Sequence, residues 1–417
     1  MRSRKRFVAA LAVVMAGGMI AFSAPAAFAL ANTPDPQCYD IRGKVYSIIE
    51  TSNHATTYVG GKFSRSSLLD GSKSYPASSL TRFDTATCAG DKTFVPTVTD
   101  ATGTEPGIIY GMALTPDDST LYIVGAFAMV NGQPRTDIAA IDTATGNLLP
   151  FTASPANQLN TIALQTDGSG NLIRIIVGGA FSRMNNKPRN NLAALHPDGT
   201  LDTSWGAQAN GTVRDLKWAT DGQTLFASGQ FTALTANGSN FPRQSIGRIN
   251  LDGSVNPWSV PLGVIPNPMT VWRMAPTANV LYVGAGAGPN FAAAYHLDHG
   301  DQGDQVWRTA TTGNVQGITL LPDGLNAIIV GHFGTNHKAQ KCGTHTLHGL
   351  ARISLASGAL DCTWTPHMLP DSGNVTAGWV DLADSTYFWV GGNFTSICEE
   401  DGVTGCVDTQ AIARFTL

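Results

Sequence analysis

The chain has 417 residues, with 26 basic and 30 acidic side chains, so its formal net charge at pH 7 is −4. Four basic residues lie within the first six positions, and the rest of the chain carries 22 basic against 30 acidic residues, a net charge of −8. This charge argues against a surface that binds nucleic acid or another polyanion. Glycine and proline number 45 and 22, and only four of the acidic residues are Glu, so the composition favours short strands and tight turns over helices.

Residues 1–31 have the features of a secretory signal peptide. A basic start ("MRSRKR") is followed by an apolar run and by small residues, and cleavage fits after Ala29 or Ala31. A membrane-spanning helix is less favoured because glycines and Pro25 interrupt the apolar run. We therefore expect a secreted, extracellular protein with no membrane span after cleavage.

Six cysteines follow this segment, and an oxidising compartment makes disulfide bonds the expectation. Cys398 and Cys406 are near neighbours in one loop and are expected to pair. The other four cysteines allow three connectivities. Of these, the sequence favours Cys38 with Cys88 and Cys342 with Cys362.

After the leader, a unit of four parts recurs in fixed order, with a period of about 45 to 65 residues that is typical of solenoids and propellers. The first part is a pair of apolar residues three positions apart: Val45/Ile48, Ile109/Met112, Leu159/Ile162, Val213/Leu216, Val271/Met274 and Val315/Ile318, with Val375 alone in repeat seven. The second is an apolar run that ends in Gly-x-Phe, at Phe63, Phe127, Phe181, Phe231, Phe333 and Phe394. The third is a short strand such as "LTRFD" or "IAAID". The fourth is a closing aromatic residue, at Phe94, Phe151, Trp205, Trp258, Trp307 and Trp364.

The Gly-x-Phe motif has a structural explanation. Glycine lets a strand bend or lets a neighbouring backbone approach closely, and the Phe two residues later points to the same side. We expect these rings to fill the space between sheets rather than to form a ligand-stacking surface.

The two chain ends complement each other in this repeat pattern. Seven first strands are matched by only six closing aromatics, because the chain stops at "IARFTL", while a spare segment, "PDPQCYDI", precedes the first repeat. We therefore expect Tyr39 and its neighbours to supply the fourth strand of the last blade and so to close a ring without free sheet edges. The sequence predicts an all-β fold, a seven-bladed β-propeller of four-stranded blades that forms a single domain over residues 32–417.

The stretches "YVGGKF…LTRFDTATC" and "IVGGAF…PRNNLAALHPDGTLDTSW" resemble the delta-sixty-type repeats of secreted bacterial β-propellers. They are more distantly similar to kelch repeats. The resemblance covers about residues 38 to 417 and implies the propeller fold. It implies no catalytic residues, since the function of this family is largely unknown and propellers serve many functions.

The loop "GHFGTNHKAQKCGTHTLHG" of repeat six is rich in histidine. His337, His345 and His348 are candidate ligands for zinc or copper, because imidazole suits these ions. The alternative is a solvated polar loop held in place by Cys342.

The turn "HLDHGDQGDQVW" of repeat five is rich in Asp instead. Asp298, Asp301 and Asp304 recur at every third position beside His296 and His299, and such an oxygen-rich loop suits calcium. The alternative is a solvated acidic turn, since no known calcium-ligand spacing is met.

The loops between second and third strands differ in length. They are long in repeat one ("SRSSLLDGSKSYPASS"), repeat six and repeat seven ("TSICEEDGVTGCVDTQA"), and short in repeat five ("AGPNF"). Loops on a rigid scaffold commonly carry function, so this asymmetry predicts a recognition groove beside the long loops. The alternative is ordinary variation in loop length.

No G-x-S-x-G, H-E-x-x-H, Walker or EF-hand motif is present in the sequence. The function favoured by the sequence is a secreted, non-catalytic binding or scaffold propeller, which recognises a glycan or a surface protein through the long loops of repeats one, six and seven. One alternative is a metal-dependent extracellular hydrolase or oxidase that uses the His-rich loop. Another is a structural protein of the cell envelope that self-associates.

Overall fold

The computed structural model describes residues 30–35, 39–68, 74–261, 264, 269–334, 338–369, 377–382, 386–400 and 402–417. Within these ranges every regular element is a β-strand. In this part of the chain no helix has the length and apolar character needed to span a membrane. The expected signal peptide lies outside the described residues, apart from its last two positions. The all-β class predicted from the sequence is confirmed.

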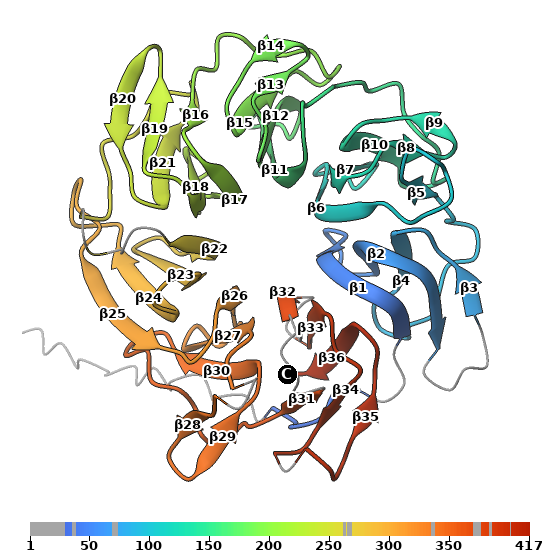
Figure 1. The fold of residues 1–417 in the computed structure, drawn as a ribbon, viewed down its shortest axis with the longest axis vertical. Coiled ribbons are helices and arrows are strands. Elements are labelled where there is room, and N and C mark those ends of the chain that lie inside the picture. The colour runs from blue at the N-terminus through green and yellow to red at the C-terminus, as the bar shows by residue number, and fades with distance from the viewer. Residues whose placement is uncertain are drawn as a thin grey trace, which may run out of the picture.

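The principal sheets follow one another around a ring (Figure 1), and the strands within each sheet pair antiparallel. The innermost strands are β1 (Tyr39–Glu50), β6 (Ile108–Leu114), β11 (Leu159–Thr166), β17 (Thr212–Trp218), β22 (Thr270–Pro276), β26 (Val315–Leu320) and β32 (Ala377–Leu382). The second strands are β2 (Thr56–Leu68), β7 (Thr120–Ala126), β12 (Leu172–Gly179), β18 (Thr224–Gln230), β23 (Val280–Gly286), β27 (Asn326–Gly331) and β33 (Tyr387–Gly392). The third strands are β4 (Leu80–Asp84), β10 (Ile138–Asp142), β15 (Leu192–Leu195), β21 (Ile246–Asn250), β24 (Phe291–His296), β30 (Leu350–Ser354) and β36 (Ile412–Thr416).

Short strands and hairpins occupy the rim of the ring (Figure 1). They are β3 (Ser74–Pro76), β5 (Val98–Thr99), β8 (Met129–Val130), β9 (Gln133–Pro134), β13 (Arg183–Met184), β14 (Lys187–Pro188), β16 (Gln208–Ala209), β19 (Ala233–Ala236), β20 (Ser239–Pro242), β28 (Gln340–Cys342), β29 (His345–Leu347), β31 (His367–Leu369), β34 (Ser396–Cys398) and β35 (Val407–Asp408). The loops that the sequence analysis called long are therefore partly built from outer hairpins.

A fourth strand with an extended ladder, interrupted by one bulge, is present in the β22-β23-β24 sheet, where β25 (Gln305–Ala310) pairs with β24. In other principal sheets the corresponding segment makes one bridge to the third strand. These bridges are Phe83–Gly90, Ile141–Leu148, Leu195–Leu201, Ile249–Val255 and Ile353–Leu360. Beyond the bridge the segment packs through its closing aromatic ring, so the outer edge is held by side-chain burial more than by backbone pairing.

The repeated apolar positions form the core. Each pair spaced by three, each Phe of Gly-x-Phe and each closing aromatic in the described residues is buried. The hydrophobic clusters lie between neighbouring sheets, and one of them joins β33 and β36 of the last repeat to β1 and β2 of the first. The structural reading of the Phe residues is confirmed.

The glycine of Gly-x-Phe is required by a close backbone approach. A Cβ atom on Gly125 would lie 1.8 Å from the carbonyl oxygen of Ile108 in the adjacent strand. The Gly125 amide donates to the Asp137 carbonyl, and the Asp137 amide donates to the Phe127 carbonyl, each at 3.0 Å. Asp137 has a φ of 62°, and the same positive-φ position recurs at Ser79, Asn191, Ser245, Gly349 and Ala411.

The expectation that Tyr39 and its neighbours supply the fourth strand of the last sheet is wrong for Tyr39 itself. Tyr39 begins β1 and pairs with Leu68 of β2, so its backbone belongs to the first sheet. An earlier residue reaches β36 instead, because the Asp35 amide donates to the Arg414 carbonyl at 2.8 Å. The Asp35 carboxylate also pairs with the Arg414 guanidinium. The N-terminal segment thus contacts the last sheet through Asp35, and Ile41 contacts the residue range just before β36, where its amide donates to the Gln410 carbonyl at 2.9 Å.

Two disulfide bonds join Cys342 to Cys362 and Cys398 to Cys406, the same pairs that the sequence favours. Cys88 is also disulfide-bonded. Its expected partner, Cys38, lies outside the described residues.

Candidate functional site

The innermost strands share one irregularity. In each of them the pairing register skips a residue opposite the second strand at a shared position, which is a β-bulge. The residues skipped at this shared position, in chain order, are Tyr46, Tyr110, Asn160, Arg214, Trp272, Gln316 and Gly378. Strand β1 has a further bulge at Arg42, and the β11–β12 pairing has a second shift near its far end. We call these residues the bulge ring.

The bulge directs these side chains away from the core. In a regular strand, residues three apart face opposite sides. Val213 and Leu216 are nevertheless both buried, with exposures of 0% and 3%, because the extra residue between them resets the alternation. Arg214, the extra residue, is only partly buried and lines a cavity. Bulges commonly re-aim a side chain in this way next to functional sites.

Most residues that line the cavity belong to the innermost strands, which surround the centre of the ring in Figure 1. The cavity has a volume of about 300 Å³. The six bulge-ring side chains other than the glycine line it. Lys44, Val45, Arg273 and His332 complete the wall. A volume of this order suits a small ligand.

The charge of this cavity is predominantly positive. The Arg273 guanidinium donates to the backbone carbonyls of Arg214 and Trp272, at 3.0 and 2.9 Å. Burial lowers the pKa of Arg214, and the nearby Arg273 charge lowers that pKa further. Two guanidinium groups held this close repel each other, so an anion placed between them is stabilised.

Asp215 is the acidic group beside these cations. It lies in the adjoining smaller cavity, where its carboxylate accepts a hydrogen bond from the Met274 amide at 2.9 Å. Burial raises the pKa of Asp215, against the lowering effect of Lys217 and Arg273. Asp215 therefore offsets the charge of Arg273, whereas Arg214 forms no salt bridge within the described residues.

The same cavity has aromatic walls. The Arg214 guanidinium carbon lies 4.9 Å from the centroid of the Trp272 ring, and Tyr46 and Tyr110 have ring centroids 5.3 Å apart. Burial raises the pKa of both tyrosines, so their hydroxyls stay neutral donors. Among the described residues, the buried Nε of Arg214 and Nε1 of Trp272 have no hydrogen-bond partner. Buried donors without partners are uncommon, and a ligand in the cavity would give them acceptors.

The bulge ring was not predicted from the sequence. The flanking apolar pairs and their spacing of three were recognised, and this spacing is the consequence of the bulge in the folded chain. Because the flanking residues repeat while the bulged position changes chemistry at nearly every repeat, the signal was present in the sequence.

The expected histidine site of repeat six is partly described. His345 contacts Glu400 of repeat seven, with Nδ1 and Oε2 2.6 Å apart. His348 stacks on His367, with ring centroids 3.6 Å apart. His337 lies outside the described residues, so the three-histidine site stays a prediction.

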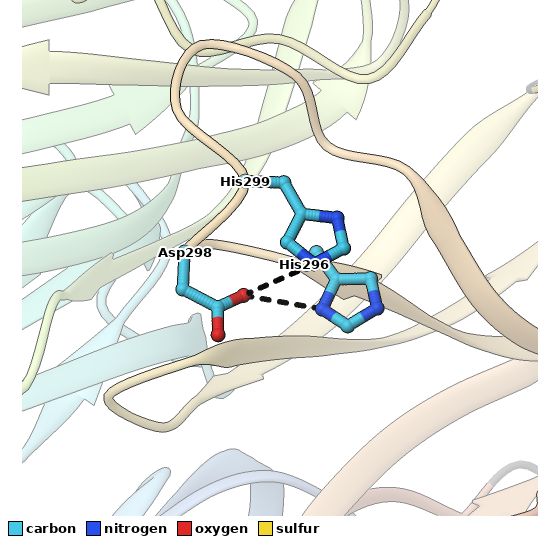
Figure 2. A group of neighbouring side chains, drawn as sticks. All are labelled: His296, Asp298 and His299. Atoms are coloured by element: carbon cyan, nitrogen blue, oxygen red, sulfur yellow. Dashed lines mark hydrogen bonds and ion pairs between the residues drawn. The ribbon is translucent and has the colours of Figure 1, made fainter.

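The acidic turn of repeat five adopts a different arrangement from the one expected for calcium. Figure 2 shows the Asp298 carboxylate beside the imidazoles of His296 and His299. Among the described residues these are the three metal-ligating groups that lie close together, and Asp301 and Asp304 do not join Asp298 in a group of carboxylates. The chemistry of the cluster is therefore imidazole-rich rather than oxygen-rich.

These features define a propeller-like, all-β protein with a pocket at its centre. A family model described as a domain of unknown function (DUF5122) beta-propeller matches residues 174–204. The solved structure of the WD40 β-propeller domain of Doa1 is similar to this chain, with a TM-score of 0.52 and 12% identity over 91% of this chain and 97% of that one. This likeness concerns the fold alone. No curated protein matches the chain.

Proposed function

We propose that this protein is a secreted, non-catalytic binding propeller whose central pocket recognises the acidic sugar of an extracellular glycan. The observation that carries the proposal is the bulge ring, in which a fixed backbone position presents different side chains around one cavity. Packing residues recur between repeats, whereas a binding surface has to differ from one repeat to the next. Divergence at the cavity wall, directly beside packing residues that recur, therefore supports recognition.

The chemistry of the ligand is inferred from the wall. Arg214 and Lys44 offer charge-assisted hydrogen bonds to a carboxylate, and Trp272 offers an apolar face against which a sugar ring packs. Asn160 is buried and its amide is already bonded to the Val213 carbonyl, so it shapes the wall. An acidic monosaccharide unit combines the charge, the flat apolar face and the size that this cavity accepts.

The architecture within this proposal has seven blades closed into a ring. Each innermost strand with its bulge represents one blade, and the cluster between β33, β36, β1 and β2 packs the last blade against the first. The bond from Asp35 to Arg414 supports closure by the N-terminal segment. Secretion is supported by the leader-like start and by the disulfide bonds.

A second contact surface is supported at the loops of repeats six and seven. The Glu400 carboxylate of repeat seven contacts strand β29 of the repeat-six hairpin, since it accepts from the Thr346 amide at 3.3 Å and contacts His345. We propose that these loops, with the loop of repeat one, contact the remainder of a glycan or the protein that carries it.

The experiment is a calorimetric titration of the purified protein with glucuronic and galacturonic acid, and with glucose and galactose as neutral counterparts. We expect the acids to bind and the neutral sugars to bind at least tenfold more weakly. Arg214→Ala should weaken acid binding by about 10- to 100-fold, the range for a lost charge-assisted hydrogen bond. Trp272→Ala should weaken binding of the sugar acids more than that of acetate, which lacks a ring.

Arg308→Ala is the matched control, because Arg308 also lies over an aromatic ring, that of Phe291, but at the outer strand β25. It should leave binding unchanged. Equal affinity for the sugar acids and the neutral sugars would refute the central-pocket proposal. So would an equal loss of affinity in Arg214→Ala and Arg308→Ala when the melting temperature is unchanged.

A further inference from the structure

We propose that His296, Asp298 and His299 form a binding site for a divalent transition-metal ion, with zinc as the physiological class of ligand. One donor atom from each residue lies within 4.8 Å of the other two. Figure 2 shows the Asp298 carboxylate facing a nitrogen of each imidazole, with the two rings lying one over the other at the end of β24. This site is independent of the central pocket.

The distances between donors fit a tetrahedral ion. Zinc bound to nitrogen and oxygen at about 2.0 to 2.1 Å separates neighbouring tetrahedral ligands by roughly 3.4 Å. His296 Nδ1 lies 3.1 Å and His299 Nε2 lies 4.0 Å from Asp298 Oδ1. The two exposed imidazoles stack with centroids 3.7 Å apart, so one ring has to turn about its side-chain bonds to direct its nitrogen at an ion shared with the other two ligands.

Asp304 supplies an outer support for this site. Its Oδ2 lies 3.5 Å from Nδ1 of His299, on the ring nitrogen opposite to the one that approaches Asp298. Metal-bound histidines almost always direct their second ring nitrogen to a carboxylate, carbonyl or water, which fixes the tautomer and ring orientation. The arrangement Asp304–His299–metal follows this rule.

The backbone holds the turn in shape before any ion binds. The His296 amide donates to the Asp304 carbonyl at 2.8 Å, and the His296 carbonyl accepts from the Trp258 indole at 3.0 Å. Ser259 of the preceding repeat bonds to Asp301 at 3.0 Å and to Gly303 at 2.9 Å. Bonds on both sides of the turn reduce the entropy lost when an ion orders the side chains.

Repeat three contains a natural comparison. There His196 directly follows the third strand, β15, and Asp198 comes two residues later, as Asp298 follows His296. In that turn Asp198 accepts hydrogen bonds from Thr200, and no second histidine is present. The second imidazole, His299, therefore distinguishes the proposed metal site from an ordinary Asp turn.

The donor set selects the ion. Two imidazoles with one carboxylate suit zinc, copper or nickel, whereas calcium prefers oxygen ligands alone. The His299 and Asp298 side chains are about half exposed, at 48% and 47%, so the fourth position is open to water. The ion would clamp the β24–β25 turn.

The test measures binding of zinc to purified protein freed of metal by chelation. Calorimetry should show zinc binding that His296→Ala/His299→Ala removes and that calcium does not compete with. Asp304→Asn should weaken zinc binding by about 10- to 100-fold while leaving the ion number unchanged, the effect expected of a supporting carboxylate. Cobalt should give the intense visible absorption of a tetrahedral ion in the native protein and lose it in the double variant.

His196→Ala is the matched control and should bind zinc as the native protein does. His345→Ala tests whether the repeat-six histidines are the source of the signal. Zinc binding that survives in His296→Ala/His299→Ala but is lost in His345→Ala would overturn the proposal, as would the absence of zinc binding in the native protein. Unchanged melting temperatures of the metal-free variants would show that their losses are not due to misfolding.

Discussion

Replacing Asp137 with Asn should stabilise the protein at neutral pH. Asp137 occupies the positive-φ position after the Gly-x-Phe segment, is only 8% exposed, and accepts a hydrogen bond from the Phe127 amide at 2.9 Å. Burial raises the pKa of this carboxyl to about 6. Asn191 occupies the equivalent position of repeat three with a φ of 60°, so the fold already accepts Asn there.

The magnitude follows from the pKa. A rise from the ordinary value of 3.8 to about 6 corresponds to about 3 kcal/mol of destabilisation once the carboxyl is ionised in both states. Below about pH 4 the group is protonated in the folded and the unfolded protein, so this cost is absent. Between about pH 4 and 6 stability falls as pH rises, because the folded state retains a proton that the unfolded state has lost. Above about pH 6 the full cost applies.

The assay is urea unfolding of the native protein and Asp137→Asn across this pH range. Asn keeps an acceptor for the Phe127 amide but carries no charge, so the variant should be more stable by about 1 to 3 kcal/mol at pH 7.5 and by close to zero at pH 4. All other titrating groups are shared and cancel in the difference. A difference that does not change with pH, or that grows towards acid, would refute the assignment of this cost to Asp137.

Two further predictions concern the scaffold. Gly125→Ala should lower the free energy of unfolding by about 3 kcal/mol or more, because its Cβ would lie 1.8 Å from the Ile108 carbonyl oxygen. Gly168→Ala is the control, because a Cβ atom there would have no atom within 4 Å. It should change the free energy of unfolding by less than about 0.5 kcal/mol in the same urea titration. Equal effects would remove the close-approach explanation of Gly-x-Phe. Cys342→Ser with Cys362→Ser should cost about 3 kcal/mol for a loop of 20 residues, and chemical reduction should then have a smaller effect on the variant than on the native protein.

The packing of the fold could be predicted from the sequence because packing recurs. Phe127 and Trp205 represent positions that return in repeat after repeat, and both are buried as expected. The role of Tyr39 could not be predicted in the same way. A strand boundary depends on where backbone pairing starts, and the side chains of "PDPQCYDI" do not determine whether Tyr39 joins β2 or the last sheet. The replacement of most fourth strands by single bridges could not be predicted for the same reason, because the side-chain pattern does not determine how far backbone pairing extends.

The ligand set proposed for repeat five could be predicted from the sequence only in part. The sequence showed that Asp298, His296 and His299 are close along the chain, but the regular spacing of Asp residues favoured calcium. The turn in the folded chain places the His299 ring on that of His296, with centroids 3.7 Å apart, and turns Asp304 to the outside. The backbone geometry of the turn, and not the spacing of one residue type, thus determines which side chains lie close together.

The bulge ring shows how a strand pattern that looks irregular can locate a binding site. Apolar residues three apart, such as Val271 and Met274, contradict the alternation of two expected for a strand, and the contradiction disappears if one residue between them is extra. The extra residue, Trp272, is released from the packing constraint that holds its neighbours and can change freely in chemistry. Because the same release occurs in successive innermost strands, a ring of unconstrained side chains surrounds one cavity, and their identity can be set by a ligand rather than by the fold.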